Sequence, residues 1–222
     1  MELPDAFALA EHLLARHGLT AWSVEFDSAK RRAGICRFGD RVIGLSAPLT
    51  RLHSVAEVED TILHEVAHAL VGPRHGHDET WRRVAREIGS SGARCVDADS
   101  PRVEAAWLGT CPEGHTVGRH RRPERVVSCP TCSPTFELAA VFAWTHHGRP
   151  TLMHPNYEAE LAALRRGERL AWLAVGSRAR VTAAGEHHGV VGRVVKRGRT
   201  TYHLKAGRML LRVPFAWVEP VR

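Results

Sequence analysis

The chain of 222 residues lacks an uninterrupted apolar run of about 18 residues, the length that a membrane-spanning helix requires. Its first residues, Met1-Glu-Leu-Pro-Asp5, carry no basic residue and no apolar stretch follows them, so we expect no secretory signal. Cysteine is scarce, with five in the chain. These absences disfavour membrane proteins and disulfide-rich secreted proteins, and they predict a cytoplasmic protein with no membrane partner.

Lysine is almost absent: three lysines stand against 28 arginines, in a chain of formal charge +7. Arginine suits bidentate contacts to phosphate, although genomic codon bias explains such a skew equally well. The basic residues are unevenly placed, because residues 175–222 contain ten Lys and Arg against two Glu. The excess of positive charge at this end predicts a polyanionic partner, most simply nucleic acid.

The central motif is H-E-x-x-H, formed by His64, Glu65 and His68. Two histidines four residues apart lie on the same face of a helix, so both imidazoles can bind one cation. The sequence S-x-x-E from Ser54 predicts a capping box at the start of this helix, and Gly72-Pro73 predicts its end. Glu65 is placed to act as a general base toward a metal-bound water.

The residues alone do not decide which side chain is the third metal ligand. His75 and His77 both lie in the loop after the motif, and Glu87 offers the His2Glu alternative. Three histidine ligands would leave the fourth tetrahedral position of a zinc ion for water, as in catalytic zinc sites.

Hydrophobic periodicity and turn residues predict the remaining elements of the first half. We expect a helix over residues 5–16, a strand over 21–26, a hairpin over 32–45 and a second helix over 78–88 after the motif helix. Cys36 and Cys95 have no partner at metal-ligand spacing, so we expect each to be a small buried apolar residue.

This order of elements, with the motif and the following His77-Asp-Glu-Thr-Trp81, resembles the SprT-like metallopeptidase domain, a family that includes the Spartan proteases. The resemblance covers residues 1–106. It implies a zincin-like domain of helices plus a small antiparallel sheet, with His64, His68 and His77 as zinc ligands and Glu65 as the catalytic base. It selects His77 because family members place this ligand four residues before an aromatic, here Trp81. Spartan proteases digest proteins crosslinked to DNA, so DNA and DNA-bound proteins are the implied partners.

Residues 107–135 have the form of a zinc ribbon. Cys129 and Cys132 make a C-x-x-C knuckle, and Cys111 begins a Cys-Pro-x-Gly-His knuckle that ends at His115, although His120 competes for that position. Four ligands in one segment predict a closed, structural zinc site that stabilises a module too small to fold on an apolar core. SprT-like proteins often carry such a ribbon, so the resemblance extends here.

We interpret residues 136–172 as a helical connector with helices over 136–144 and 156–169. Residues 173–222 contain short glycine-punctuated strands that predict a small SH3-like β-barrel, and the G-x-x-G-x-V-V-K pattern at 189–196 resembles the KOW type. We expect six basic residues of this barrel to contact nucleic-acid backbone without reading its sequence: Arg178, Arg180, Arg193, Lys196, Arg197 and Arg199.

The sequence therefore predicts an α+β protein with a zincin-like domain, a zinc ribbon and a small β-barrel. The predicted function is a zinc endopeptidase, holding one catalytic and one structural Zn²⁺, that cleaves proteins bound or crosslinked to DNA in the nucleoid. Single-stranded, branched or damaged DNA are the candidate forms. The alternatives are a non-catalytic nucleic-acid adaptor and a zinc hydrolase that acts on nucleic acid itself.

Overall fold

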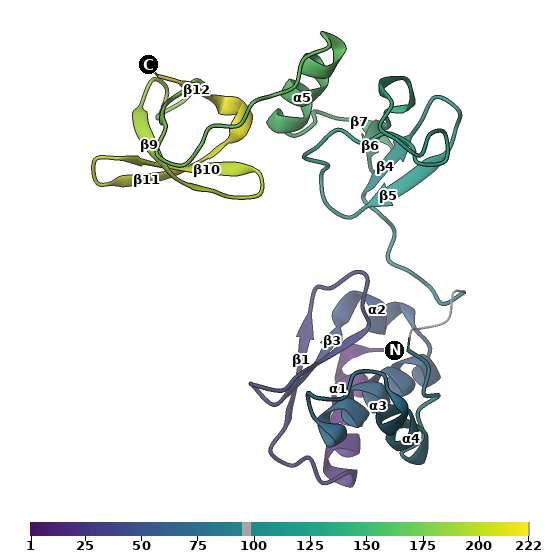
Figure 1. Cartoon of the computed structure of the whole chain (residues 1–222). Coiled ribbons are helices and arrows are strands. Elements are labelled where there is room, and N and C mark those ends of the chain that lie inside the picture. The colour runs from purple at the N-terminus through teal and green to yellow at the C-terminus, as the bar shows by residue number, and fades with distance from the viewer. Residues whose placement is uncertain (95–98, 222) are drawn as a thin grey trace. The chain divides into compact units, whose positions relative to one another are not determined.

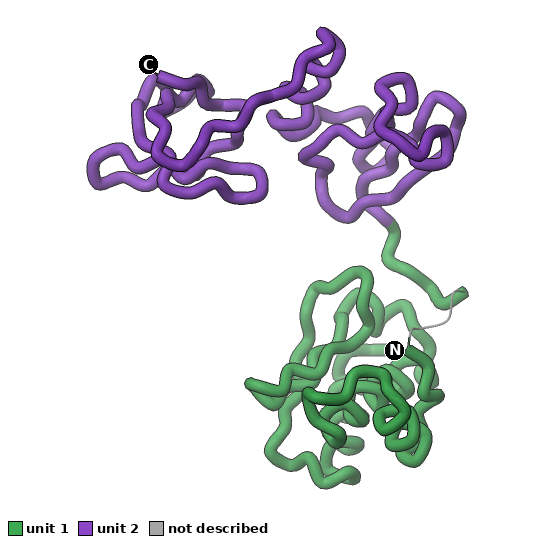
Figure 2. Tube along the Cα trace, viewed as in Figure 1, with its two compact units in different colours: residues 1–104 green, residues 105–222 purple. Residues whose placement is uncertain are grey.

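A computed structural model describes residues 1–94 and 99–221, so Cys95 lies outside the described residues. The chain forms two compact units, residues 1–104 and 105–222, which Figure 2 shows in green and purple. No helix within the described ranges is long and apolar enough to cross a membrane.

The first unit is a mixed α and β structure whose elements follow the predicted order (Figure 1). Its elements are α1 (Leu3–Arg16), β1 (Ser23–Asp27), β2 (Gly34–Arg37), β3 (Val42–Ser46), α2 (Ala47–Leu52), α3 (Val55–Val71) and α4 (Glu79–Glu87). The predicted helices at α1, α3 and α4 are confirmed to within about two residues. Helix α2 was not predicted, although Ser46 caps it by accepting a hydrogen bond from Leu49 N and Pro48 lies in its first turn.

The core of this unit lies between α1, α3 and the sheet. Leu13 and Leu14 of α1 pack with Ile62 and Val66 of α3, and these four side chains are at most 3% exposed. Every residue of β3 is buried. The core therefore fixes α3, the helix that carries the H-E-x-x-H motif.

The three-stranded sheet corrects one prediction. Its strand order is β1-β3-β2; β2 and β3 form the expected antiparallel hairpin, but β1 runs parallel to β3. The sheet was predicted to be antiparallel throughout. The chain passes from β1 to the far edge at β2 before β3 returns between them, which makes β3 the central strand. The apolar run of β3, covered on both faces, is typical of that position.

The second unit begins with a four-stranded antiparallel sheet of order β5-β4-β6-β7. Its elements are β4 (Trp107–Thr110), β5 (Thr116–Arg119), the 3₁₀ turn η1 (Leu138–Ala140), β6 (Ala143–His146), β7 (Arg149–Pro150) and α5 (Pro155–Arg165). The helix expected over residues 136–144 is wrong, because this segment forms η1 and then β6, which pairs with β4. Phe142 and Trp144 are buried while Ala143 is exposed, which is the period of a strand. The helix expected over residues 156–169 is present as α5 but ends at Arg165, four residues earlier than predicted.

The last segment forms a five-stranded antiparallel sheet of order β11-β10-β9-β8-β12. Its elements are β8 (Arg178–Val181), β9 (Val191–Arg197), β10 (Thr201–Ala206), β11 (Met209–Pro214), η2 (Phe215–Trp217) and β12 (Val218–Pro220). The short strands predicted for this segment are present. The described strands form an open sheet with edges at β11 and β12 rather than a closed barrel. The core on one face includes Val194, Tyr202 and Leu204, each at most 1% exposed.

Helix α5 connects the two sheets of the second unit. Tyr157 Oη donates to Phe142 O at 3.0 Å on the side of the first sheet. Asn156, 1% exposed, donates from Nδ2 to Thr200 O at 2.7 Å and accepts at Oδ1 from Ala216 N at 3.0 Å. Residues 155–165 therefore belong to the packed structure of this unit, whereas the sequence predicted a connector.

Candidate active site and second metal centre

Helix α3 places His64 and His68 one turn apart on one face. Ser54 and Glu57 form the predicted capping box at its start, and Gly72, with φ of 85°, ends it. The Nε2 atom of His77 lies 3.0 Å from His64 Nε2 and 3.2 Å from His68 Nε2. Ligands about 2.0–2.1 Å from a tetrahedral zinc ion lie about 3.3 Å apart, so this triangle of nitrogens fits a zinc ion with little adjustment.

The structure distinguishes His77 from the alternative third ligands. His75 Nδ1 is hydrogen-bonded to Asp78 Oδ2 at 2.8 Å, and Asp78 also caps α4 by accepting from Trp81 N at 2.9 Å. Glu87 forms an exposed ion pair with Arg83 at 2.8 Å. Neither His75 nor Glu87 joins the group of potential ligands, whose three ligand atoms lie within 4.8 Å of one another.

Trp81 packs against all three histidines. It is fully buried, and its ring centroid lies 4.6 Å from that of His64, 5.1 Å from that of His68 and 4.6 Å from that of His77. The first turn of α4 therefore sets both the position of His77, just before the helix, and the aromatic surface that limits rotation of the imidazoles.

A second set of contacts holds His64. The Ala93 carbonyl accepts a hydrogen bond from this imidazole. Asp60, one turn before His64 on α3, accepts hydrogen bonds from Ser90 Oγ at 2.8 Å, Ser91 N at 2.7 Å and Ser91 Oγ at 2.8 Å. These bonds fasten the segment that contains Ala93 to the motif helix. Sequence reasoning missed Asp60, although its i−4 spacing from His64 is a signal that could have indicated it.

The side chain of Glu65 lies between helix α3 and strand β2. It is 7% exposed, and its carboxylate accepts a hydrogen bond from the Cys36 backbone. Burial raises the pKa of Glu65 to about 7, while the Cys36 bond and the positive charge of Arg32 act in the opposite direction. A carboxylate with a pKa near neutrality is suited to accept and then return a proton.

Gly34 of β2 lies directly against this carboxylate. A Cβ atom at Gly34 would lie 2.7 Å from both Cγ and Oε1 of Glu65 and 3.0 Å from Thr61 Cγ2. Only a residue without a side chain permits this approach of β2 to α3. The sequence did not indicate Gly34, because its neighbour Glu65 is far away along the chain.

A second candidate metal site lies in the second unit, where Cys111, His115, Cys129 and Cys132 come together with all ligand atoms within 4.8 Å. Cys111 Sγ lies 3.5 Å from His115 Nδ1 and 3.7 Å from Cys132 Sγ. Cys132 Sγ lies 3.3 Å from His115 Nδ1. Three sulfurs and one imidazole at these separations fit a closed, four-coordinate zinc site.

Local backbone structure forms the two knuckles of this centre. Between Cys111 and His115 the chain turns at Gly114, with φ of 82°, and Gly114 N donates to Cys111 O at 2.9 Å. Burial acts to raise the pKa of Cys129, but N–H donors from Cys132 and Thr131 outweigh it, so the pKa is lowered to about 7. His120, the competing ligand, is not among these four residues.

The face of the five-stranded sheet opposite its core is basic. Directly paired residues of neighbouring strands share a face, so the register aligns Arg178, Arg193 and Lys205 in one row. It aligns Lys196, His203 and Arg212 in a second row on the same face. Sequence reasoning had included neither His203 nor Arg212 among the predicted contact residues, because the strand register that brings them together is not local information.

Three of the six predicted contact residues lie outside these rows. Arg180 is on the same face but forms an ion pair with Glu219 at 3.4 Å. Arg199 is paired with Glu124 at 3.0 Å. Arg197 is opposite Tyr202, a core residue, and therefore lies toward the other face at the end of β9. Of the six predicted contact residues, those that lie on the basic face without an ion pair among the described residues are therefore Arg178, Arg193 and Lys196.

Comparison with known proteins gives a matching family model and similar solved structures. Residues 4–102 match the model of the SprT-like family. No curated protein matches the chain. The crystal structure of the metallopeptidase zymogen of Pyrococcus abyssi abylysin is similar at 22% identity, over 37% of this chain and 87% of that chain, with a TM-score of 0.32. The family match includes the H-E-x-x-H helix and His77.

Proposed function

We propose that the first unit is a zinc-dependent endopeptidase, because residues 4–102 match the SprT-like family model. The observation that carries the proposal is the convergence of His64, His68 and His77 at Nε2–Nε2 distances of 3.0 and 3.2 Å, with Glu65 next to the first ligand. Three neutral ligands leave a position for water, which distinguishes this centre from the closed four-ligand centre of the second unit.

The chain's own residues support a hydrolytic mechanism. A zinc ion on the three histidines would supply Lewis acidity toward a water molecule and the scissile carbonyl group. Glu65 accepts the proton of the attacking water and passes it to the leaving amine. Its buried position against β2 holds the carboxylate in place, and Trp81 with the Ala93 carbonyl orients the imidazoles.

The proposed substrates are proteins bound or crosslinked to DNA. The basic face of the last sheet supports this proposal, because Arg178, Arg193 and Lys205 form a row of positive charge that can contact phosphate groups. The Cys111–Cys132 centre would bind a second, structural zinc ion and stabilise the unit that carries this face. Association with the nucleoid would follow from binding DNA.

Cleavage of a DNA-binding protein, measured with and without DNA, tests both parts of the proposal. We expect the wild-type protein to cleave faster with DNA, and Glu65→Gln to abolish cleavage while zinc content and DNA affinity stay unchanged. Equal cleavage by wild type and Glu65→Gln would refute the assigned base. Cleavage that DNA does not accelerate would refute the proposal that DNA binding brings the endopeptidase to its substrates.

The alternative function is a nucleic-acid adaptor without catalysis, which the basic face and the four-ligand centre also support. An adaptor would bind two zinc ions and DNA and would cleave neither protein nor nucleic acid. Trimming of bare DNA or RNA that His68→Ala abolishes would instead identify a nucleic-acid hydrolase.

A further inference from the structure

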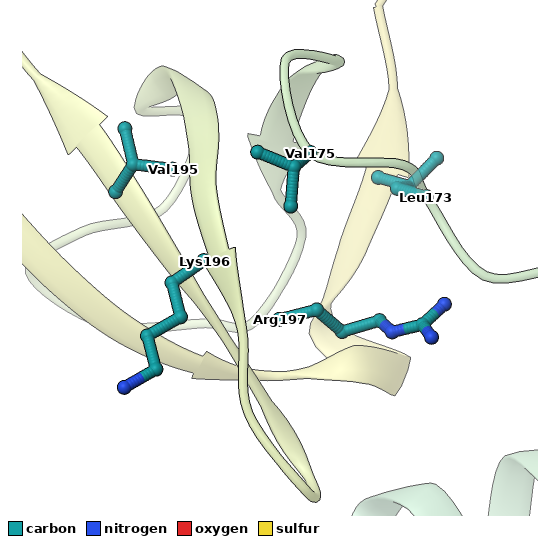
Figure 3. A pocket seen from close by; sticks show the side chains of 5 residues that line it. All are labelled: Leu173, Val175, Val195, Lys196 and Arg197. Carbon is teal, nitrogen blue, oxygen red and sulfur yellow. The ribbon is translucent and has the colours of Figure 1, made fainter.

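The second unit has a pocket of about 500 Å³ beside the basic face. It is lined by Leu173 and Val175, from the segment before β8, and by Val195, Lys196 and Arg197 of β9. In Figure 3 the three aliphatic side chains lie along the upper side of the opening and the two cationic side chains along the lower side. Apolar and positively charged surfaces therefore face the same volume.

A β-bulge forms the cationic side of the pocket. Leu204 pairs with Val194 and His203 pairs with Lys196, so Val195 is an extra residue in β9 with no partner of its own on β10. A bulge changes the direction of the side chains at and after it. It thereby places Val195, Lys196 and Arg197 at the pocket, whereas regular pairing would continue the alternation between core and basic face.

Two of the aliphatic side chains at the pocket are largely exposed, and its two charged side chains have no ion-pair partner among the described residues. Val175 is 63% exposed and Val195 43% exposed. Lys196 and Arg197 form no ion pair with any residue that the structure describes, unlike Arg180 and Arg199, which are paired with glutamates. A ligand that fits must therefore bring a flat or apolar group and a negative charge close together.

A nucleotide combines these two features, since its base has apolar faces and its phosphate is anionic. In a duplex the bases are stacked and paired, so only an unstacked base of a single strand can enter a side pocket. The neighbouring row, in which the cations Lys196 and Arg212 flank His203, continues the surface along which a strand could pass. We propose that this pocket binds one unstacked base of a single-stranded nucleic acid, with the adjacent phosphates on Lys196 and Arg197. The inference rests on the proposed role in binding nucleic acid and adds strand selectivity to it.

The test is fluorescence anisotropy of the full zinc-loaded chain with three probes: a single-stranded oligonucleotide, an abasic oligonucleotide of the same length, and its duplex. The abasic probe keeps the phosphates and removes the bases. We expect the single strand to bind roughly three- to tenfold more tightly than the abasic strand, and more tightly than the duplex. Val195→Ser should remove this preference without weakening binding of the abasic strand. Leu152→Ser, at an exposed aliphatic residue of the same unit outside the five-stranded sheet, is the matched control and should keep the preference.

The outcomes separate the two proposals. Equal affinity of wild type for the normal and abasic strands would overturn the pocket while leaving electrostatic binding by the basic face intact. Loss of the preference in Leu152→Ser as well as in Val195→Ser would also overturn it. Absence of binding to all three probes would overturn the nucleic-acid role itself, and the pocket proposal with it.

Discussion

At the scale of single residues, Gly34 limits where the Glu65 carboxylate can lie. The two residues are in contact only because Gly34 has no side chain, since a Cβ atom there would come within 2.7 Å of Glu65 Cγ. Glu65 is buried, and its Cγ lies in the middle of the side chain rather than at its mobile end. The carboxylate would therefore have to move to make room for a methyl group at residue 34. A displacement of about 1 Å near reacting groups can lower a rate about a hundredfold.

We therefore predict that Gly34→Ala lowers kcat for peptide cleavage roughly ten- to hundredfold while zinc content is unchanged. Steady-state kinetics and metal analysis of the same preparation check this. Gly39→Ala in the same hairpin is the matched control, because a Cβ there meets nothing within 4 Å. Wild-type kcat in Gly34→Ala would show that Glu65 does not need its observed position.

Residue identity and spacing predicted His64 and His68 on the motif helix and the cysteines of the two knuckles, because these candidate ligands are close in sequence. His77 was selected over His75 by resemblance. The structure supplies a physical reason: His75 is bonded to Asp78, which caps α4. Gly34 and Asp60 escaped prediction because their roles depend on segments that only folding brings together.

At the scale of elements, the sequence predicted α1, α3 and α4 well, since each has a long apolar periodicity and a recognisable end. It failed at residues 136–144, a short apolar run in which a helix and a strand cannot be told apart by pattern. The strand forms because Phe142 and Trp144 are buried in a core with Trp107, a partner that lies far away in the chain. The sequence pattern likewise could not predict the parallel pairing of β1 with β3, because strand order is not a local property.

Helix α5 supplies the element-scale prediction. Asn156→Ala removes two hydrogen bonds at a buried position and leaves Thr200 O and Ala216 N without that partner. The free energy of unfolding of the second unit should fall by about 1–3 kcal/mol, measured by denaturant titration of the full chain. Glu158→Ala, at an exposed position of the same helix, should change it by less than about 0.5 kcal/mol. Equal effects of both substitutions would show that Asn156 does not join α5 to the last sheet.

At the scale of the whole molecule, the two candidate metal sites relate differently to the apolar cores. The three histidines lie on α3 and before α4, and α3 is held by an apolar core that contains none of them. Cys111 and Cys129, in contrast, are themselves core residues of the second unit, packed with Trp107 and Trp144. Removal of metal should therefore leave the first unit folded and should loosen the first sheet of the second unit.

Amide hydrogen exchange on the full chain, before and after chelation, measures this difference. We expect exchange to accelerate in β4 and β6 and to stay slow in α1 and α3. His68→Ala should lower zinc content by one ion per chain and abolish cleavage without changing exchange in β4. Cys129→Ser should lower zinc content by one ion and accelerate exchange in β4, while α3 keeps its protection. If either substitution released both ions, the centres would not be independent, and the division between a catalytic centre and a supporting one would be wrong.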